Sequence, residues 1–168
     1  YVALDFGLRE MQIIDVSNPR SLSRVGYANV NSRRGKDVEV NETGTRAYLI
    51  TDEAGDMREL FIIDTTSKSG SLPLIGTYDT HGMNPRDLAL VTENKLIIVG
   101  TGGEEYQVVD ITDESHPTMC GSLNLDTGVY GVDGVLEQDG EAYSYIVSKD
   151  STSEFKIIEG GAGDSFAT

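Results

Sequence analysis

The hydrophobic positions of this chain come in short runs that repeat at a nearly constant interval. One run ends on an acidic residue four times, at Asp15, Asp64, Asp110 and Glu159, with spacings of 49, 46 and 49 residues. The four runs read MQIIDV, LFIIDT, YQVVDI and FKIIEG. A fixed period of this length is typical of an architecture that builds one supersecondary unit from each repeat.

Each period has the pattern of β-strands. Segments of roughly four to eight residues rich in Val, Ile, Leu and Tyr alternate with clusters of Gly, Asn, Asp, Ser and Pro. No stretch keeps a 3.6-residue period, so almost no helix is expected. We letter the four strands of a unit A to D from the inside outward, and in one complete unit we expect them to begin at Asp37, Arg46, Leu60 and Pro73. Four antiparallel strands per period predict the blade of a β-propeller, an all-β fold.

Other positions recur in register with the acidic residues. Gly26, Gly76 and Gly121 occupy equivalent places in the predicted D strands. Tight turns are predicted at Thr43–Gly44 and Asp139–Gly140, because glycine accepts the positive φ that hairpin turns require. These columns support a repeated four-stranded unit.

The first copy of the repeat resembles a known family. Residues 11–19 read MQIIDVSNP and are followed by Val25-Gly26-Tyr27, which is similar to the LVIVD repeat of bacterial and archaeal surface propellers. YVTN-type blades are more distantly similar. The resemblance covers nearly the whole chain, up to about Glu159. It implies a propeller that is extracellular or at a prokaryotic cell surface, and it implies no enzyme activity and supplies no catalytic residues.

The predicted strands divide the chain into incomplete and complete blades. We expect about 3.5–4 blades of 46–50 residues within residues 1–159: BCD in 1–30, ABCD in 31–80, ABCD in 81–125 and ABC in 126–159. Residues 160–168 form a Gly-rich tail, in which Phe166 and Ala167 would begin the missing last strand. Neither the first nor the last predicted blade has all four strands, so we expect a fragment of a longer chain or a ring closed by another subunit.

Composition narrows the function classes. The net charge of −15, with only 13 basic residues, argues against nucleic acid and against direct contact with an anionic membrane. Such charge keeps an extracellular or high-salt protein soluble and monomeric, and a specific cation-binding role is the alternative. The single cysteine, Cys120, excludes an internal disulfide, and we expect it at a buried strand position.

The few basic residues indicate a ligand face. Four of them are expected in the loops between D and A strands, where a basic patch would hold a carboxylate or an anionic sugar, and three further residues from equivalent loops would share that face. The alternative is pairing with nearby acidic side chains. The seven residues are Arg33, Arg34, Lys36, His81, Asn84, Arg86 and Tyr130.

Repeated carboxylates offer a second candidate site. Asp37, Asp87 and Asp133 head the predicted A strands and would line the channel, where several oxygens suit a hard cation such as calcium. Alternatively, each pairs with Lys36 or Arg86, or caps the backbone of a neighbouring blade. The acidic residues that close the C strands are expected to be turn acceptors in the following loop.

The two histidines do not indicate a metal site or an active site. His81 and His116 lack metal-ligand spacing, and no nucleophile elbow is present, so we expect no transition metal and no cofactor, with calcium as the one cation considered. We expect His116 to lie in a turn. The favoured function is a non-catalytic binding or display module for a protein or carbohydrate ligand. The alternatives are a propeller glycosidase or lyase that uses Asp37 and Asp87, and a purely structural subunit.

Overall fold

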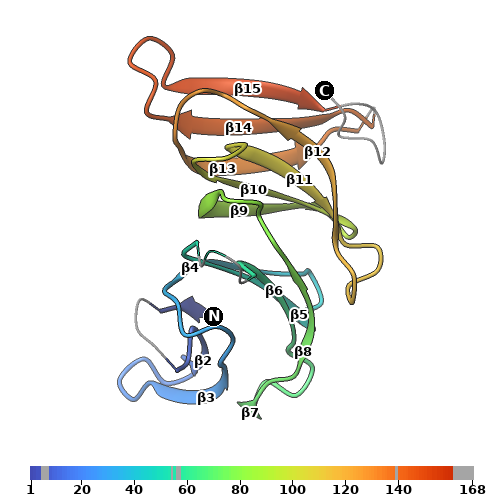
Figure 1. Cartoon of the computed structure of the whole chain (residues 1–168). Coiled ribbons are helices and arrows are strands. Elements are labelled where there is room, and N and C mark those ends of the chain that lie inside the picture. The colour runs from blue at the N-terminus through green and yellow to red at the C-terminus, as the bar shows by residue number, and fades with distance from the viewer. Residues whose placement is uncertain (5–7, 54, 56–57, 139, 161–168) are drawn as a thin grey trace.

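A computed structural model describes residues 1–4, 8–53, 55, 58–138 and 140–160, and Figure 1 shows its trace. The described residues form β-strands in four sheets and no helix, so the expected all-β class is confirmed. Among them there is consequently no helix that could span a membrane. Gly160, the first residue of the predicted tail, ends a strand, and the rest of the tail with its strand start at Phe166 lies outside the described residues.

The first two sheets come from the N-terminal half of the chain. Sheet 1 has the order β1-β2-β3-β7, with strands Val2–Ala3, Met11–Asp15, Ser23–Ala28 and Gly70–Ser71. Sheet 2 has the order β4-β5-β6-β8, with strands Gly35–Val40, Arg46–Thr51, Leu60–Asp64 and Leu74–Tyr78.

The last two sheets follow the same plan. Sheet 3 has the order β9-β10-β11-β12, with strands Asn84–Thr92, Lys95–Thr101, Tyr106–Asp110 and Thr118–Leu123. Sheet 4 has the order β13-β14-β15, with strands Val129–Leu136, Ala142–Ser148 and Phe155–Gly160. The sheets follow one another in chain order as propeller blades and do not close into a ring (Figure 1).

Some strand limits differ from those predicted. The A strands begin before their aspartates, at Gly35, Asn84 and Val129, because register shifts let the pairing continue past the irregular residue. Four of the predicted loop residues therefore lie within strands, and their assignment to loops was wrong. They are Lys36 in β4, Asn84 and Arg86 in β9, and Tyr130 in β13.

One strand pairing was not predicted. β7 belongs to the C–D loop of the second unit, yet it pairs in parallel with β3 of sheet 1, Gly26 opposite Gly70. Leu72 N–H also donates to the carbonyl oxygen of Tyr27 at 2.9 Å. The loop of one unit thus covers the outer strand of the preceding unit.

The apolar core lies between consecutive sheets. One cluster joins sheets 1 and 2, a second joins sheets 2 and 3, and a third joins sheets 3 and 4; each contains aliphatic side chains from the B and C strands, such as Leu49, Ile98 and Ile146. Alternate residues of an internal strand contact the sheets on its two opposite sides. In β10, Leu96 and Ile98 belong to the second cluster, and Ile97 and Val99 belong to the third.

Close packing explains why glycine recurs at equivalent positions of the D strands. A Cβ at Gly26 would lie 2.7 Å from the carbonyl oxygen of Lys68, and a Cβ at Gly76 would overlap the carbonyl oxygen of Glu114. Both carbonyls belong to the C–D loop of the next unit. The loop that would approach Gly121 in the same way follows β15 and lies outside the described residues.

Cys120 is exposed, so its predicted buried position was wrong. Val108 pairs with Gly121 and Val109 pairs with Met119, which leaves Cys120 as the extra residue of a β-bulge in the outer strand β12. The alternation that suggested burial is interrupted at that bulge.

We predict that Gly76→Ala lowers the free energy of unfolding by about 1–3 kcal/mol, since the added methyl group forces the next unit's loop away from β8. Urea-induced unfolding measures the change. The matched control is Thr77→Ala on the same strand, and equal stability of the two variants would contradict the packing argument.

Candidate functional site

Asp15, Asp64 and Asp110, which close three of the C strands, are turn acceptors, as the sequence predicts, and the loop after Glu159 lies outside the described residues. Oδ1 of Asp15 accepts a hydrogen bond from Ser17 N–H at 2.9 Å, and Asp64 accepts one from Thr66 at 2.8 Å. Asp110 does the same and also binds Lys95 Nζ at 2.7 Å. The bond from Lys95, with those from the turn, lowers the pKa of Asp110 to about 2.

A second acidic column was missed by the sequence analysis. Glu10, Glu59 and Glu105 directly precede the C strands and are almost fully buried. Each accepts a backbone N–H about twenty residues later, with Glu10 bound to Val30 at 2.8 Å and Glu105 bound to Leu125 at 2.9 Å. The signal was available, because a glutamate stands five residues before every closing acidic residue. Its role is to hold the end of the D strand.

The inner strands bring two carboxyl groups together. Oδ2 of Asp37 accepts from Leu88 N–H at 3.3 Å, and Oδ2 of Asp87 accepts from Val132 N–H at 2.8 Å. Each aspartate therefore caps the backbone of the following sheet. Burial, a hydrogen bond with Asp37 and its negative charge raise the pKa of Asp87 to about 6.

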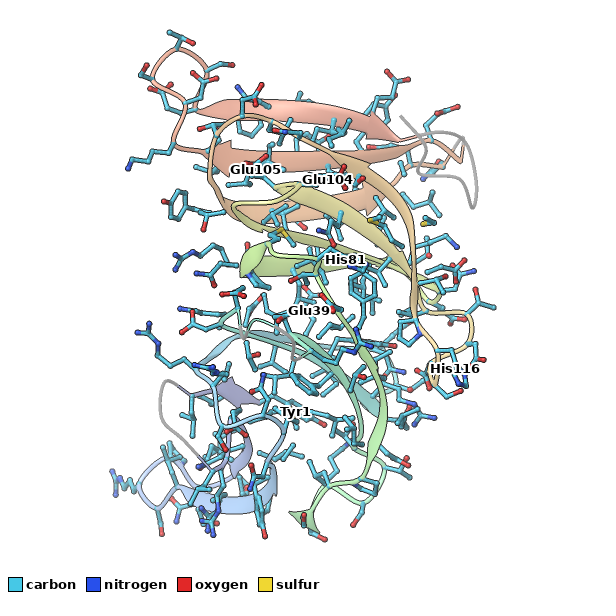
Figure 2. All side chains as sticks on the ribbon, viewed as in Figure 1. Tyr1, Glu39, His81, Glu104, Glu105 and His116 are labelled. Carbon is cyan, nitrogen blue, oxygen red and sulfur yellow. The ribbon has the colours of Figure 1, made fainter. Side chains whose placement is uncertain are left out.

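The third aspartate of this column does not form such a cap among the described residues. Asp133 is exposed, and its Oδ1 accepts from the adjacent Gly134 N–H at 2.9 Å. Glu39 lies between sheets 2 and 3 (Figure 2), where Oε2 accepts from Leu90 N–H at 2.7 Å. Within the described part of the chain, no three His, Cys, Asp or Glu residues are placed to hold a metal ion.

Three of the predicted ligand residues line one cleft. Arg33, Arg34 and Asn84 share it with Ser32, Asp52 and Glu53, and its volume is about 410 Å³. The D–A loop before β4 supplies residues 32–34, the loop after β5 supplies residues 52 and 53, and Asn84 begins β9. The cleft is thus built at the junction between sheets 2 and 3.

One wall of the cleft is an ion-pair network around Asp52. Arg34 Nε lies 2.5 Å from Oδ2, and Lys36 Nζ lies 2.6 Å from Oδ1. Burial acts to raise the pKa of Asp52, but hydrogen bonds from Lys36 and Arg34 outweigh it and keep that pKa below its ordinary value. Lys36 therefore supports the cleft from its edge and is not free to bind a ligand.

The other hydrogen-bond donors of the cleft have fewer partners among the described residues. The Arg33 side chain is exposed and forms no ion pair with the described residues, while its backbone N–H donates to Asn31 Oδ1. Asn84 uses Oδ1 to accept from Glu53 N–H at 3.2 Å, which leaves its NH₂ group as a donor. Ser32 has a φ of 59°, a strained value that serine adopts only when its surroundings impose it.

His81 lies in a different hollow, of about 280 Å³, together with Arg58, Tyr78 and Asp79. Arg58 binds Asp79 at 2.9 Å, and the His81 ring packs edge-on against Tyr78. Figure 2 shows His81 and His116 on separate loops. His116 lies in a turn, as expected, where its Nδ1 is 3.2 Å from an Asp113 carboxylate oxygen.

Arg86 and Tyr130 form a third group. The Arg86 guanidinium lies over the Tyr130 ring, 5.8 Å from its centre, and Arg86 Nε is buried without a partner among the described residues. The seven predicted ligand residues are thus divided among three neighbourhoods, and only three of them share the cleft.

Comparison with known proteins identifies the repeat. The family model of the LVIVD repeat matches residues 1–30 and 95–125, which correspond to sheet 1 without β7 and to most of sheet 3. No curated protein gives a match.

The raised pKa of Asp87 predicts a pH-dependent stability. This pKa is about 6 in the folded protein and about 3.9 in an unfolded chain. The stability that the folded protein gains from the protonated Asp87 carboxyl group is therefore fully present below pH ~4 and is lost as pH rises through 6. Asp87→Asn keeps an acceptor for Val132 N–H and removes the titration. Relative to wild type, we expect the variant to gain about 1–2 kcal/mol between pH 4 and pH 7, after allowance for solvent screening.

Urea unfolding at pH 4, 5, 6 and 7 measures this gain. The exposed Asp133→Asn is the matched control and should follow the wild-type profile. Parallel wild-type and Asp87→Asn profiles would contradict the assigned carboxyl pair.

Proposed function

We propose that this chain, in which two stretches match the LVIVD repeat of β-propellers, is a non-catalytic binding module. It holds a carboxylate-bearing ligand in the cleft of Ser32, Arg33, Arg34, Asp52, Glu53 and Asn84. The observation that carries this proposal is the exposed Arg33 guanidinium, which forms no ion pair with the described residues of a strongly acidic protein. A guanidinium binds a carboxylate through two parallel hydrogen bonds, which gives both strength and orientation.

Apart from the Glu53 carboxylate, the rest of the cleft supports an anionic ligand. Asp52 is already neutralised by Arg34 and Lys36, so it does not repel a second carboxylate as an unpaired acid would. Ser32 and Asn84 add donors beside Arg33. A volume of about 410 Å³ fits one sugar ring or one short side-chain segment rather than an extended macromolecule.

The cleft would therefore recognise one acidic group of a larger partner. The partner is an acidic glycan or an acidic protein segment, and both present the same carboxylate. The surrounding negative charge disfavours highly anionic polymers such as nucleic acids, because their approach is repelled over most of the surface. We place this module outside the cell or at a prokaryotic cell surface, in line with its acidic composition.

A propeller hydrolase is the second candidate, and the Asp37–Asp87 pair is the observation that favours it. A carboxyl group with a pKa of about 6 beside another carboxyl is a suitable general acid. Both groups, however, accept backbone N–H bonds from the following sheet, and neither lines the cleft. We therefore favour binding without catalysis.

We predict that Arg33→Gln weakens binding of an oligosaccharide that carries one uronic acid, or of a peptide that carries one Glu, roughly tenfold to a hundredfold, the effect of losing a hydrogen-bonded charge pair. Titration calorimetry with both probes, and with a neutral oligosaccharide, identifies the ligand class. Arg20→Gln makes the same change in charge on an exposed C–D loop and should leave affinity unchanged.

Equal binding by wild type and Arg33→Gln would remove the cleft as the binding site. Hydrolysis of the oligosaccharide that is lost in Asp37→Asn and kept in Arg33→Gln would instead support the enzyme.

A further inference from the structure

The outward face of sheet 4 carries exposed apolar side chains. Val147 is 53% exposed, and Phe155 and Ile157 are each 58% exposed. The Tyr145 ring stacks on Phe155 with centres 6.2 Å apart. We call these four residues, which lie side by side on β14 and β15, the exit face. An apolar patch of this kind normally marks a binding surface.

The equivalent positions of the internal sheets are buried. The strand pairing aligns Val147, Phe155 and Ile157 with residues of sheets 2 and 3 that face the next sheet along the chain. Those residues are 0–2% exposed; they are Ile50, Leu60 and Ile62 in sheet 2 and Val99, Tyr106 and Val108 in sheet 3. The exit face therefore has the composition of an interface between blades and no blade against it among the described residues.

Sheet 1 presents the complementary surface. Val2 is 41% exposed and Val16 is 66% exposed, and with Gln12 and Ile14 they form what we call the entry face. The equivalent residues of sheet 3 pack against sheet 2 and are 0–1% exposed: Ile98, Gln107, Val109 and Ile111.

The glutamine of the entry face has an informative counterpart. Gln107 accepts a hydrogen bond from Tyr78 of the preceding sheet at 3.0 Å and donates to the carbonyl oxygen of Thr80 at 2.8 Å. Gln12 occupies the same position on sheet 1. The entry face thus repeats both the apolar and the polar groups of an interface between blades.

We propose that the exit face of one copy of this chain packs against the entry face of a second copy, head to tail. Each internal interface of the chain joins these same two sets of positions. The two faces, which no other described residues cover, therefore continue an interface that the structure already contains three times. Two such contacts around a two-fold axis close a ring of eight sheets, which is within the size range of propellers.

The charge of the chain sets the salt dependence of this assembly. Each copy carries a net charge of −15, so two copies repel one another at low ionic strength. Added salt screens that repulsion and does not weaken apolar burial. The dimer is therefore tighter in 0.5 M than in 0.05 M sodium chloride, the opposite of an assembly held by ion pairs.

Sedimentation equilibrium of the whole chain at several concentrations tests the proposal. We expect a monomer–dimer equilibrium in wild type, and Kd raised at least about tenfold by Val147→Glu on the exit face or by Val16→Glu on the entry face. Both substitutions are at exposed positions, so the fold is kept. Leu74→Glu is the matched control, because Leu74 is 51% exposed on β8, outside both faces, and this variant should dimerise as wild type does.

Mixing the two variants separates head-to-tail packing from other contacts. The Val16→Glu copy keeps an intact exit face and the Val147→Glu copy keeps an intact entry face, so the equimolar mixture regains one contact and dimerises more tightly than either variant alone. A monomeric wild type at all concentrations overturns the proposal. A dimer that is broken by Val147→Glu but not by Val16→Glu also overturns it, because that result indicates that the exit face of one copy packs against the exit face of the other. The cleft is not involved, so failure here leaves the proposed function standing.

Discussion

The face-to-face burial of apolar strands between consecutive sheets is the interaction on which the rest of this structure depends. A sheet in this chain has two apolar faces, so it cannot bury both by itself. β5 (Arg46–Thr51) illustrates the constraint, because Leu49 faces sheet 1 and Tyr48 faces sheet 3, and both side chains are almost fully buried. Stability then accumulates between nearest neighbours along the chain, as in other repeat proteins.

The stacking of sheets also covers backbone polar groups, which then need hydrogen-bond partners within the protein. Inner strands lie at sheet edges, and their N–H groups need acceptors once neighbouring sheets cover them. Asp37 and Asp87 meet this demand across sheet boundaries. A carboxylate suits the position because it offers several lone pairs to converging donors. The closeness of Asp37 and Asp87 follows from this arrangement, and the raised pKa of Asp87 is its electrostatic consequence.

The sequence was sufficient for the features that depend on local periodicity. The C strands begin at Met11, Leu60 and Tyr106, as the repeated runs indicate, and the turn at Gly44 has the positive φ of 67° that its sequence predicts. Features that depend on irregular pairing were not predictable in this way. The early start of β9 and the exposure of Cys120 both result from bulges, which break the alternation used to infer them.

The candidate site was only partly predictable for a different reason. The D–A loop was identified from Arg33 and Arg34, but the acid that organises it, Asp52, lies in a loop outside the repeated columns. The parallel pairing of β7 with β3 likewise depends on two units meeting in space. Contacts between non-repeated segments carry no periodic signal, so one sequence cannot reveal which side chains they join.

Residues that repeat in every unit build the fold, whereas residues that do not repeat form the candidate binding cleft. The interface between blades occurs three times with similar groups, whereas the basic cleft occurs at one junction. At the next junction the loop after β10 contributes Gly102 and Gly103, and the equivalent D–A loop before β9, residues 79–83, has no Arg or Lys. The cleft opens beside the inner strands, and the entry and exit faces lie on the flat sides of the outermost sheets. Substitutions can therefore change ligand preference without altering how sheets pack, because the two surfaces share no residues.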